Sequence, residues 1–188
     1  MKLSYLVKGL PGHPIHPPLT DATIGIYTGA TVFAVLSALD VSARNTATAW
    51  WLTLVIGLIV TGPTAVTGLI DWLGITRGTP LWRTATIHLL AMVTATVFFL
   101  LAAIVGHGGY VDGEVNGSGL LLTLIGFGML TLGGWLGGTV VFVHGMRVLN
   151  LVGEPTRRAV APVPTPEKEA AAGESSRPDE ERDGLTRY

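Results

Sequence analysis

Long stretches almost without charge are the feature that most limits what this chain can fold into. Residues 22–70 contain only two charged side chains, and residues 84–146 contain only two more. A transmembrane helix needs about 20 mostly apolar residues to cross about 30 Å of hydrocarbon. Four stretches meet this requirement, at about 19–38, 50–71, 84–106 and 119–146. We therefore predict an all-α integral membrane protein whose four transmembrane helices form a bundle.

The composition of the two ends differs from that of the predicted spans. Residues 1–18 contain the run LPGHPIHPPL, which is too rich in proline for a helix before Pro18 and lacks the continuous apolar core of a signal peptide. We expect this segment to run extended along the membrane surface, with Pro17 or Pro18 opening the first span. Residues 151–188 lack apolar periodicity and are predicted to be a disordered tail. The transmembrane domain then covers residues 19–150.

Basic residues are distributed unevenly between the two sides of the predicted bundle. With four spans, both termini lie on the same side as the loop between the second and third spans. Up to Arg158, that side carries seven basic residues and the other side only Arg44, and Lys and Arg favour the cytoplasmic side of a membrane. We expect both termini to lie in the cytoplasm. The seven are Lys2, Lys8, Arg77, Arg83, Arg147, Arg157 and Arg158.

Histidine and aspartate residues near the ends of the spans gather at one level. Because successive spans alternate in direction, the starts of the first and third spans lie level with the ends of the second and fourth. His88 lies about one turn, or roughly 6 Å, inside its span, whereas His107 belongs to a glycine-rich loop on the opposite side. The residues at this level are His13, His16, Asp21, Asp71, His88 and His144.

Two interpretations of this polar layer stay open. Ionisable residues at membrane depth are costly and tend to face the interior of a bundle, which favours a functional site. At the membrane surface, however, water and head groups solvate such residues cheaply. Asp21 would then stabilise the start of a helix, and Asp71 would pair with Arg77 or Arg83.

A functional layer admits three chemistries. A b-type haem needs two imidazoles that face each other in a helix bundle, and His16, His88 and His144 are the candidates. A proton path would use the same histidines and aspartates as relays. The chain has no cysteine, which excludes disulfides, thiolate metal sites and a directly ligated iron–sulfur cluster. A transition-metal site would take mixed nitrogen and oxygen ligands from His16, Asp21, Asp71 and His88.

Small residues at helical spacing mark the predicted fourth span. The sequence GGWLGG places Gly133 four residues before Gly137, and Gly134 four residues before Gly138. This spacing allows two helix backbones to approach closely. We expect the four glycines to pack inside the bundle, with homo-oligomer formation as the alternative.

Four motifs resemble those of a bacterial membrane-protein family, domain of unknown function 2231. They are HPPLTDATIGIYTGA, GLIDWLG, IHLLAM and GGWLGGTVVFVHGMRV, and they occur in order between residues 12 and 148. The presence of Asp21, where many relatives carry a second histidine, resembles a subgroup with members fused to Rieske-type iron–sulfur domains. The resemblance implies a membrane module that works beside redox proteins. The family pattern corresponds here to His16, Pro17, Asp21, Gly25, Asp71, Trp72, His88, Gly133, Leu136, Gly137 and Gly138.

These observations give a leading hypothesis and an alternative. The leading one is a redox-associated or metal- or haem-binding membrane subunit, whose partners are the lipid bilayer and a membrane redox protein. The alternative is a non-catalytic scaffold or accessory subunit that packs through its glycine-rich fourth helix. A small transporter has less support, because no internal repeat is visible. Enzyme activity stays open, and no nucleic-acid partner is expected.

Overall fold

The computed structural model describes residues 4–10, 12–149, 153 and 155–161. No strand is present among these residues, and four helices are long and apolar enough to cross a membrane. The prediction of an all-α protein with four transmembrane helices is therefore confirmed. These helices are α2 (His16–Ala38), α3 (Ala43–Leu73), α4 (Pro80–Val105) and α6 (Gly117–Gly138), and a π-helical turn, η1 (Thr139–Val143), continues α6.

The ends of the helices differ from the sequence-based expectation. Helix α2 begins at His16 and carries prolines in its first turn, where a missing backbone N–H costs no helical hydrogen bond. Two short helices lie outside the predicted spans, α1 (Ser4–Lys8) and α5 (His107–Asp112). Hydropathy does not reveal such helices, because each is too short to show a periodic pattern.

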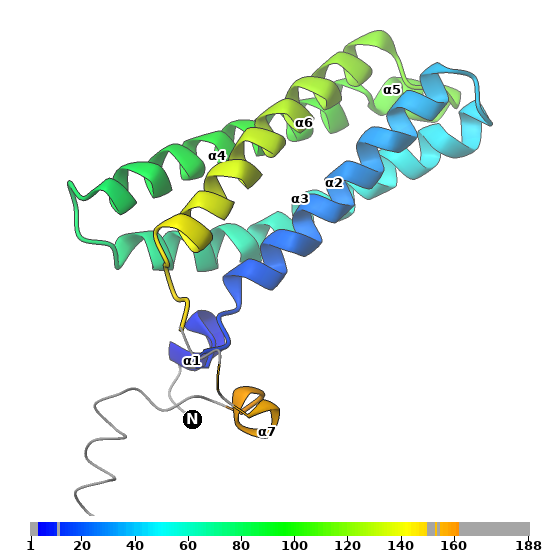
Figure 1. The fold of residues 1–188 in the computed structure, drawn as a ribbon. Coiled ribbons are helices and arrows are strands. Elements are labelled where there is room, and N and C mark those ends of the chain that lie inside the picture. Colours follow the sequence, from blue (N-terminus) through cyan, green and yellow to red (C-terminus); the bar gives the residue numbers. More distant parts are fainter. Residues whose placement is uncertain (1–3, 11, 150–152, 154, 162–188) are drawn as a thin grey trace, which may run out of the picture. The chain divides into compact units, whose positions relative to one another are not determined.

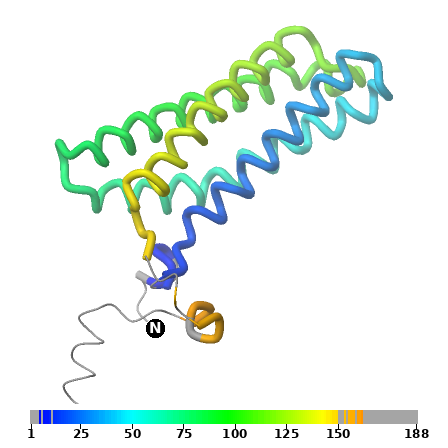
Figure 2. Tube along the Cα trace, viewed as in Figure 1, coloured from blue at the N-terminus to red at the C-terminus, as the bar shows by residue number. Residues whose placement is uncertain are grey.

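The four long helices form two antiparallel pairs. Helix α2 packs along α3, and α4 packs along α6 (Figures 1 and 2). Contacts between α3 and α4, and between α2 and α6, join the two pairs. Helices α2 and α4 consequently lie diagonally across the bundle.

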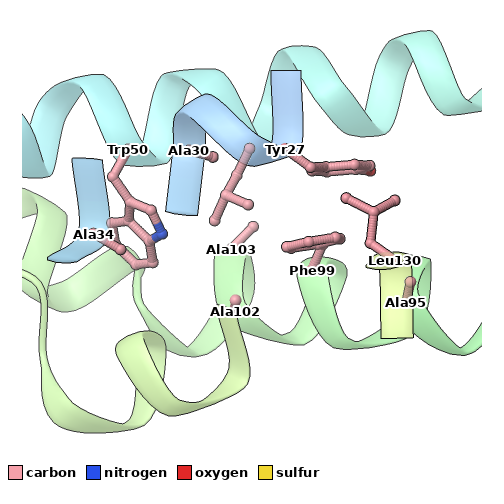
Figure 3. Packing of buried hydrophobic residues seen from close by; sticks show 10 residues of the cluster. Tyr27, Ala30, Ala34, Trp50, Ala95, Phe99, Ala102, Ala103 and Leu130 are labelled. Carbon is pink, nitrogen blue, oxygen red and sulfur yellow. The ribbon is translucent and has the colours of Figure 1, made fainter. Parts of the chain in front are cut away.

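A densely packed core runs from the middle of the bundle to the end that carries α5. The rings of Tyr27 and Phe99 stack with their centroids 4.0 Å apart and their planes 6° from parallel. Trp50 is fully buried and donates its indole N–H to Thr123 over 3.1 Å. Alanines on α2 and α4 let the backbones approach these large side chains (Figure 3). The aromatic stack thus ties α2 to α4 at mid-membrane level.

A second compact unit contains residues 10–13 and the chain from residue 149 onward. Its described part includes an antiparallel bridge between Leu10 and His13 and the short helix α7 (Thr156–Ala159). Most of the predicted tail 151–188 lies outside the described residues, so its disorder stays a prediction.

Candidate functional site

A cavity of about 580 Å³ lies between the four helices at the end opposite α5. Its lining is mostly apolar and comes from α2, α3, α4 and α6. Four of the candidate residues line it: His16, Asp21, Asp71 and His88. The structure therefore brings together, in one hollow, residues that are up to 72 positions apart in the sequence.

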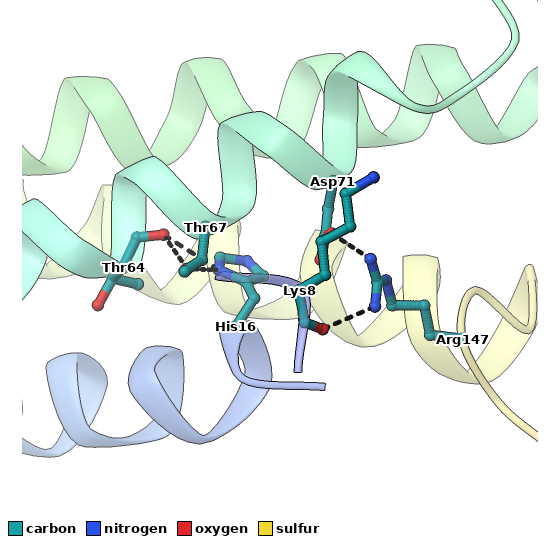
Figure 4. Close-up of polar contacts among 6 residues, drawn as sticks. All are labelled: Lys8, His16, Thr64, Thr67, Asp71 and Arg147. Atoms are coloured by element: carbon teal, nitrogen blue, oxygen red, sulfur yellow. Dashed lines mark hydrogen bonds and ion pairs between the residues drawn. The ribbon is translucent and has the colours of Figure 1, made fainter. Parts of the chain in front are cut away.

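His16 is fixed against helix α3 by hydrogen bonds at one ring nitrogen. Its Nδ1 lies 3.1 Å from the carbonyl oxygen of Thr64 and 3.2 Å from the hydroxyl of Thr67 (Figure 4). Since a carbonyl oxygen only accepts hydrogen bonds, we assign the proton of the neutral ring to Nδ1. The Nε2 atom then keeps its lone pair.

The nearest hydroxyl to His16 Nε2 does not engage this lone pair. Thr20 Oγ1 lies 3.4 Å from Nε2, at the limit of a hydrogen bond. The same hydroxyl donates its single proton to the backbone carbonyl of His16 over 3.0 Å. The lone pair of Nε2 is consequently available to a ligand.

His88 is fixed in the same manner, against helix α6. Its Nδ1 lies 2.7 Å from the carbonyl oxygen of Gly133, so this nitrogen also carries the proton of the neutral ring. Within the described part of the chain, no hydrogen bond engages Nε2 of His88. Metal-ligating histidines commonly donate their other ring N–H to a backbone carbonyl, which orients the ring and raises its basicity.

Glycines on the neighbouring helices make room for both imidazoles. A Cβ atom at Gly68 would lie 2.6 Å from Cε1 of His16, and one at Gly137 would lie 3.0 Å from Cε1 of His88. Real Cβ contacts of that length are absent or rare, so a larger residue displaces the ring. Each histidine is therefore held between a carbonyl and a glycine of the next helix.

The four glycines of the fourth span have different neighbours. Gly133 faces Met92 and Gly137 faces His88, both on α4. The position of a Cβ at Gly134 is 3.8 Å from Ile24 on α2, and at Gly138 the nearest atom belongs to Phe142 of η1. Helix α6 therefore approaches α4 closely at Gly133 and Gly137.

Asp71 forms an ion pair at the edge of the cavity. Its carboxylate lies 2.6 Å from the guanidinium of Arg147, and only 10% of its side chain is exposed. Arg147 also donates to the backbone carbonyl of Lys8 over 3.0 Å. The expected pairing of Asp71 with Arg77 or Arg83 is therefore wrong. The partner of Asp71 could not be predicted from the sequence, because Arg147 follows the fourth span and lies far from Asp71 along the chain.

The remaining candidates differ in their placement. His144 lies outside the cavity lining, and its Nε2 is 3.0 Å from the hydroxyl of Thr84. Asp21 lines the cavity but is exposed on α2. Among the described residues, no group of three or more His, Cys, Asp or Glu side chains is arranged to hold a metal ion. Of the three proposed haem ligands, only His16 and His88 share the cavity.

Sequence reasoning missed several residues that shape this site. Thr64 and Thr67 hold His16, and Arg147 neutralises Asp71. In the sequence, Arg147 contributed only to the count of basic residues. Rotation about each helix axis decides these contacts, and the apolar pattern of a membrane helix does not fix that rotation.

Comparison with known proteins identifies a family. The model of a family described as predicted membrane protein (DUF2231) matches residues 12–150. Neither the curated proteins nor the solved structures contain a match to this chain. The matched region covers all four long helices and the cavity between them, and the chain belongs to this family.

Proposed function

We propose that this member of the DUF2231 family is a membrane-embedded haem-binding subunit, in which His16 and His88 would hold a b-type haem. One observation carries the proposal. Two imidazoles from diagonally opposite helices line one apolar cavity, and each has its Nδ1 held by a carbonyl and its Nε2 available.

The residues present fit such a group. Ligand cavities commonly measure about 300–1,000 Å³ and have mostly apolar walls with a few polar groups, which describes this cavity. Cofactor sites of helix bundles are built from side chains on facing helices. Axial ligand identity and the dryness of the surroundings are the means by which a protein tunes haem iron. When bound, the haem would supply one-electron transfer.

The chain's own residues would orient the haem and exclude water from it. The carbonyls of Thr64 and Gly133 set the ring orientation of the two ligands. Tyr27 lines the cavity and stacks on Phe99, so the aromatic core closes the cavity toward mid-membrane. At the other end, the charges of Asp71 and Arg147 compensate each other.

Other chemistries have less support. A metal bound by His16, Asp21, Asp71 and His88 has less support, because no three such side chains among the described residues are arranged to hold a metal ion. A proton relay would need hydroxyls free to pass protons along the bundle. The hydroxyls of Thr64 and Thr67 instead donate to carbonyls of their own helix. The alternative is a scaffold that packs against a partner through the glycines of α6. It has less support, because Gly133 and Gly137 already lie against α4 of the same chain.

The proposal includes a partner and an orientation. A haem-binding subunit without cysteine would exchange electrons with a separate membrane redox protein, in line with the resemblance to a subgroup fused to Rieske-type domains. The excess of basic residues supports placing the haem near the cytoplasmic side of a bacterial plasma membrane.

Haem content and a reduced-minus-oxidised absorption spectrum of the gently purified full chain test the proposal. We expect equimolar haem and a reducible Soret band in the natural protein. The His88→Ala and His16→Ala variants should lose most of the haem, because each lacks one of the two histidines that would hold it. His144→Ala is the matched control, since His144 lies level with the site but outside the cavity.

Two outcomes would contradict the proposal. A folded protein that neither retains haem nor binds added haem would exclude the function. Haem that survives both cavity variants but is lost in His144→Ala would place the ligands elsewhere.

A further inference from the structure

A second cavity lies at the same end of the bundle, outside the histidine site. It measures about 600 Å³ and is bounded by the end of α3, the following loop and the start of α4. Lys8 of α1 and Arg147 complete its wall. Asp71, Ile75, Met146 and Arg147 line both cavities, so the Asp71–Arg147 pair stands on the boundary between them.

The charged residues of this second cavity are predominantly basic. Lys8 and Arg147 are cations, Asp71 is the single carboxylate, and the remaining lining residues are uncharged. Arg147 contacts both the carboxylate of Asp71 and the backbone carbonyl of Lys8 (Figure 4). Asp71 pairs with Arg147, and no ion pair involves Lys8 among the described residues. The cavity therefore carries one uncompensated positive charge.

Arg147 keeps hydrogen-bonding capacity for a further acceptor. A guanidinium has five N–H donors. The structure uses one for Asp71 and one for the carbonyl of Lys8. The planar arrangement of the remaining donors suits the oxygens of a phosphate, and Lys8 adds a flexible point charge.

The polar and apolar parts of the lining match an amphipathic ligand. Thr76 and Thr79 contribute hydroxyl groups from the loop, whereas Ile70 and Leu81 contribute apolar surface from the adjoining helices. Both helices are membrane spans that end or begin here, so the cavity lies where lipid head groups meet the hydrocarbon. Basic pockets at this level of membrane proteins bind anionic head groups.

We propose that this cavity binds the phosphate of an anionic phospholipid, with Lys8 and Arg147 contacting the phosphate oxygens. The lipid's acyl chains extend along the apolar ends of α3 and α4. One uncompensated positive charge suits the single negative charge of a phosphodiester. This site is independent of the haem, because neither His16 nor His88 lines it.

Retention of phospholipid by the full-length protein in detergent, measured by native mass spectrometry, tests the proposal. The probes are phosphatidylglycerol, phosphatidylcholine and inorganic phosphate. We expect phosphatidylglycerol to bind about five-fold more tightly than phosphatidylcholine, since one basic residue near a membrane surface contributes about that factor. Inorganic phosphate at the same concentration should not displace the lipid.

Two glutamine variants distinguish specific binding of the lipid in this cavity from non-specific electrostatic attraction of the lipid to basic residues. Lys8→Gln should lose the preference for phosphatidylglycerol. Arg77→Gln should keep it, because Arg77 is an exposed cation of the same loop that does not line the cavity. Equal loss in both variants would overturn the proposal, as would equal binding of the two lipids or displacement by inorganic phosphate. His88→Ala should bind lipid normally, so failure of the haem proposal stays distinguishable.

Discussion

Each imidazole of the candidate site depends on a glycine whose missing side chain leaves space for the ring. The contact is closer at Gly68 than at Gly137, because a Cβ atom at Gly68 would lie 2.6 Å from Cε1 of His16. His16 also has hydrogen bonds to α3 that hold its ring at this place. Backbone and ring therefore leave no room for a methyl group.

Substitution of Gly68 by alanine should displace His16 without unfolding the bundle. Alanine favours a helix over glycine by about 0.5–1 kcal/mol, so the backbone tolerates the change. We expect Gly68→Ala to lower haem retention several-fold while the unfolding midpoint stays near that of the natural protein. Haem content and denaturant unfolding, measured on the same preparation, report the two quantities.

Gly62→Ala on the same helix is the control. No atom lies within 4 Å of the position of its Cβ, so haem retention should be unchanged. Equal haem content in Gly68→Ala and the natural protein would show that His16 is not a ligand in the observed position.

Helix pairs α2–α3 and α4–α6 meet through the stacked rings of Tyr27 and Phe99 at the centre of the bundle. Both rings are essentially inaccessible, and one comes from each pair. In lipid, helix association depends on close packing rather than on removing apolar surface from water. A vacancy at this stack should therefore weaken the junction between the pairs.

We expect Phe99→Ala to reduce the free energy of unfolding by about 2–3 kcal/mol. This loss lies at or below the lower end of the losses caused by such substitutions in the cores of soluble proteins. Part of the loss in a soluble protein comes from the transfer of apolar surface from water, and that part is smaller in a membrane. Unfolding in mixed detergent micelles measures it. Phe142→Ala, where the side chain is 85% exposed, should change stability little. Similar losses in both variants would contradict a central role for the stack.

Some elements could be predicted from the sequence and others could not. Four spans follow directly from long apolar stretches, because a helix satisfies all of its backbone hydrogen bonds within one such stretch. Alternation of span direction correctly places His16, Asp71, His88 and His144 at the same end of the bundle. Depth alone does not distinguish His88 from His144, since rotation about the helix axes sends one into the cavity and the other toward Thr84.

The whole molecule carries a charge asymmetry that predicts its orientation. Among the described residues of the bundle, one end carries Lys8, Arg77, Arg83 and Arg147 and the opposite end carries Arg44, and this distribution favours cytoplasmic termini. The absence of cysteine makes the test direct, because a single introduced cysteine is the only reactive thiol.

Single-cysteine variants at the two ends should react differently in intact cells. Gly108 and Gly153 both have open space around the position of a Cβ, so cysteine fits at either. A membrane-impermeant maleimide should label Gly108→Cys from outside and label Gly153→Cys only after lysis. The reverse pattern would invert the proposed orientation and place the haem site at the outer surface.

In the whole bundle, we expect His16 of α2 and His88 of α4 to bind the same haem. Ferric haem with two imidazole ligands is low-spin, whereas loss of one ligand without replacement leaves it high-spin. Electron paramagnetic resonance of the oxidised full chain distinguishes the two states. His16→Gly and His88→Gly each leave space for imidazole added from solution.

We expect a low-spin signal in the natural protein and in His144→Ala. The haem that each glycine variant retains should give a high-spin signal, and added imidazole should restore both the low-spin state and the haem content. A low-spin signal that persists in either glycine variant without imidazole would contradict ligation by that histidine.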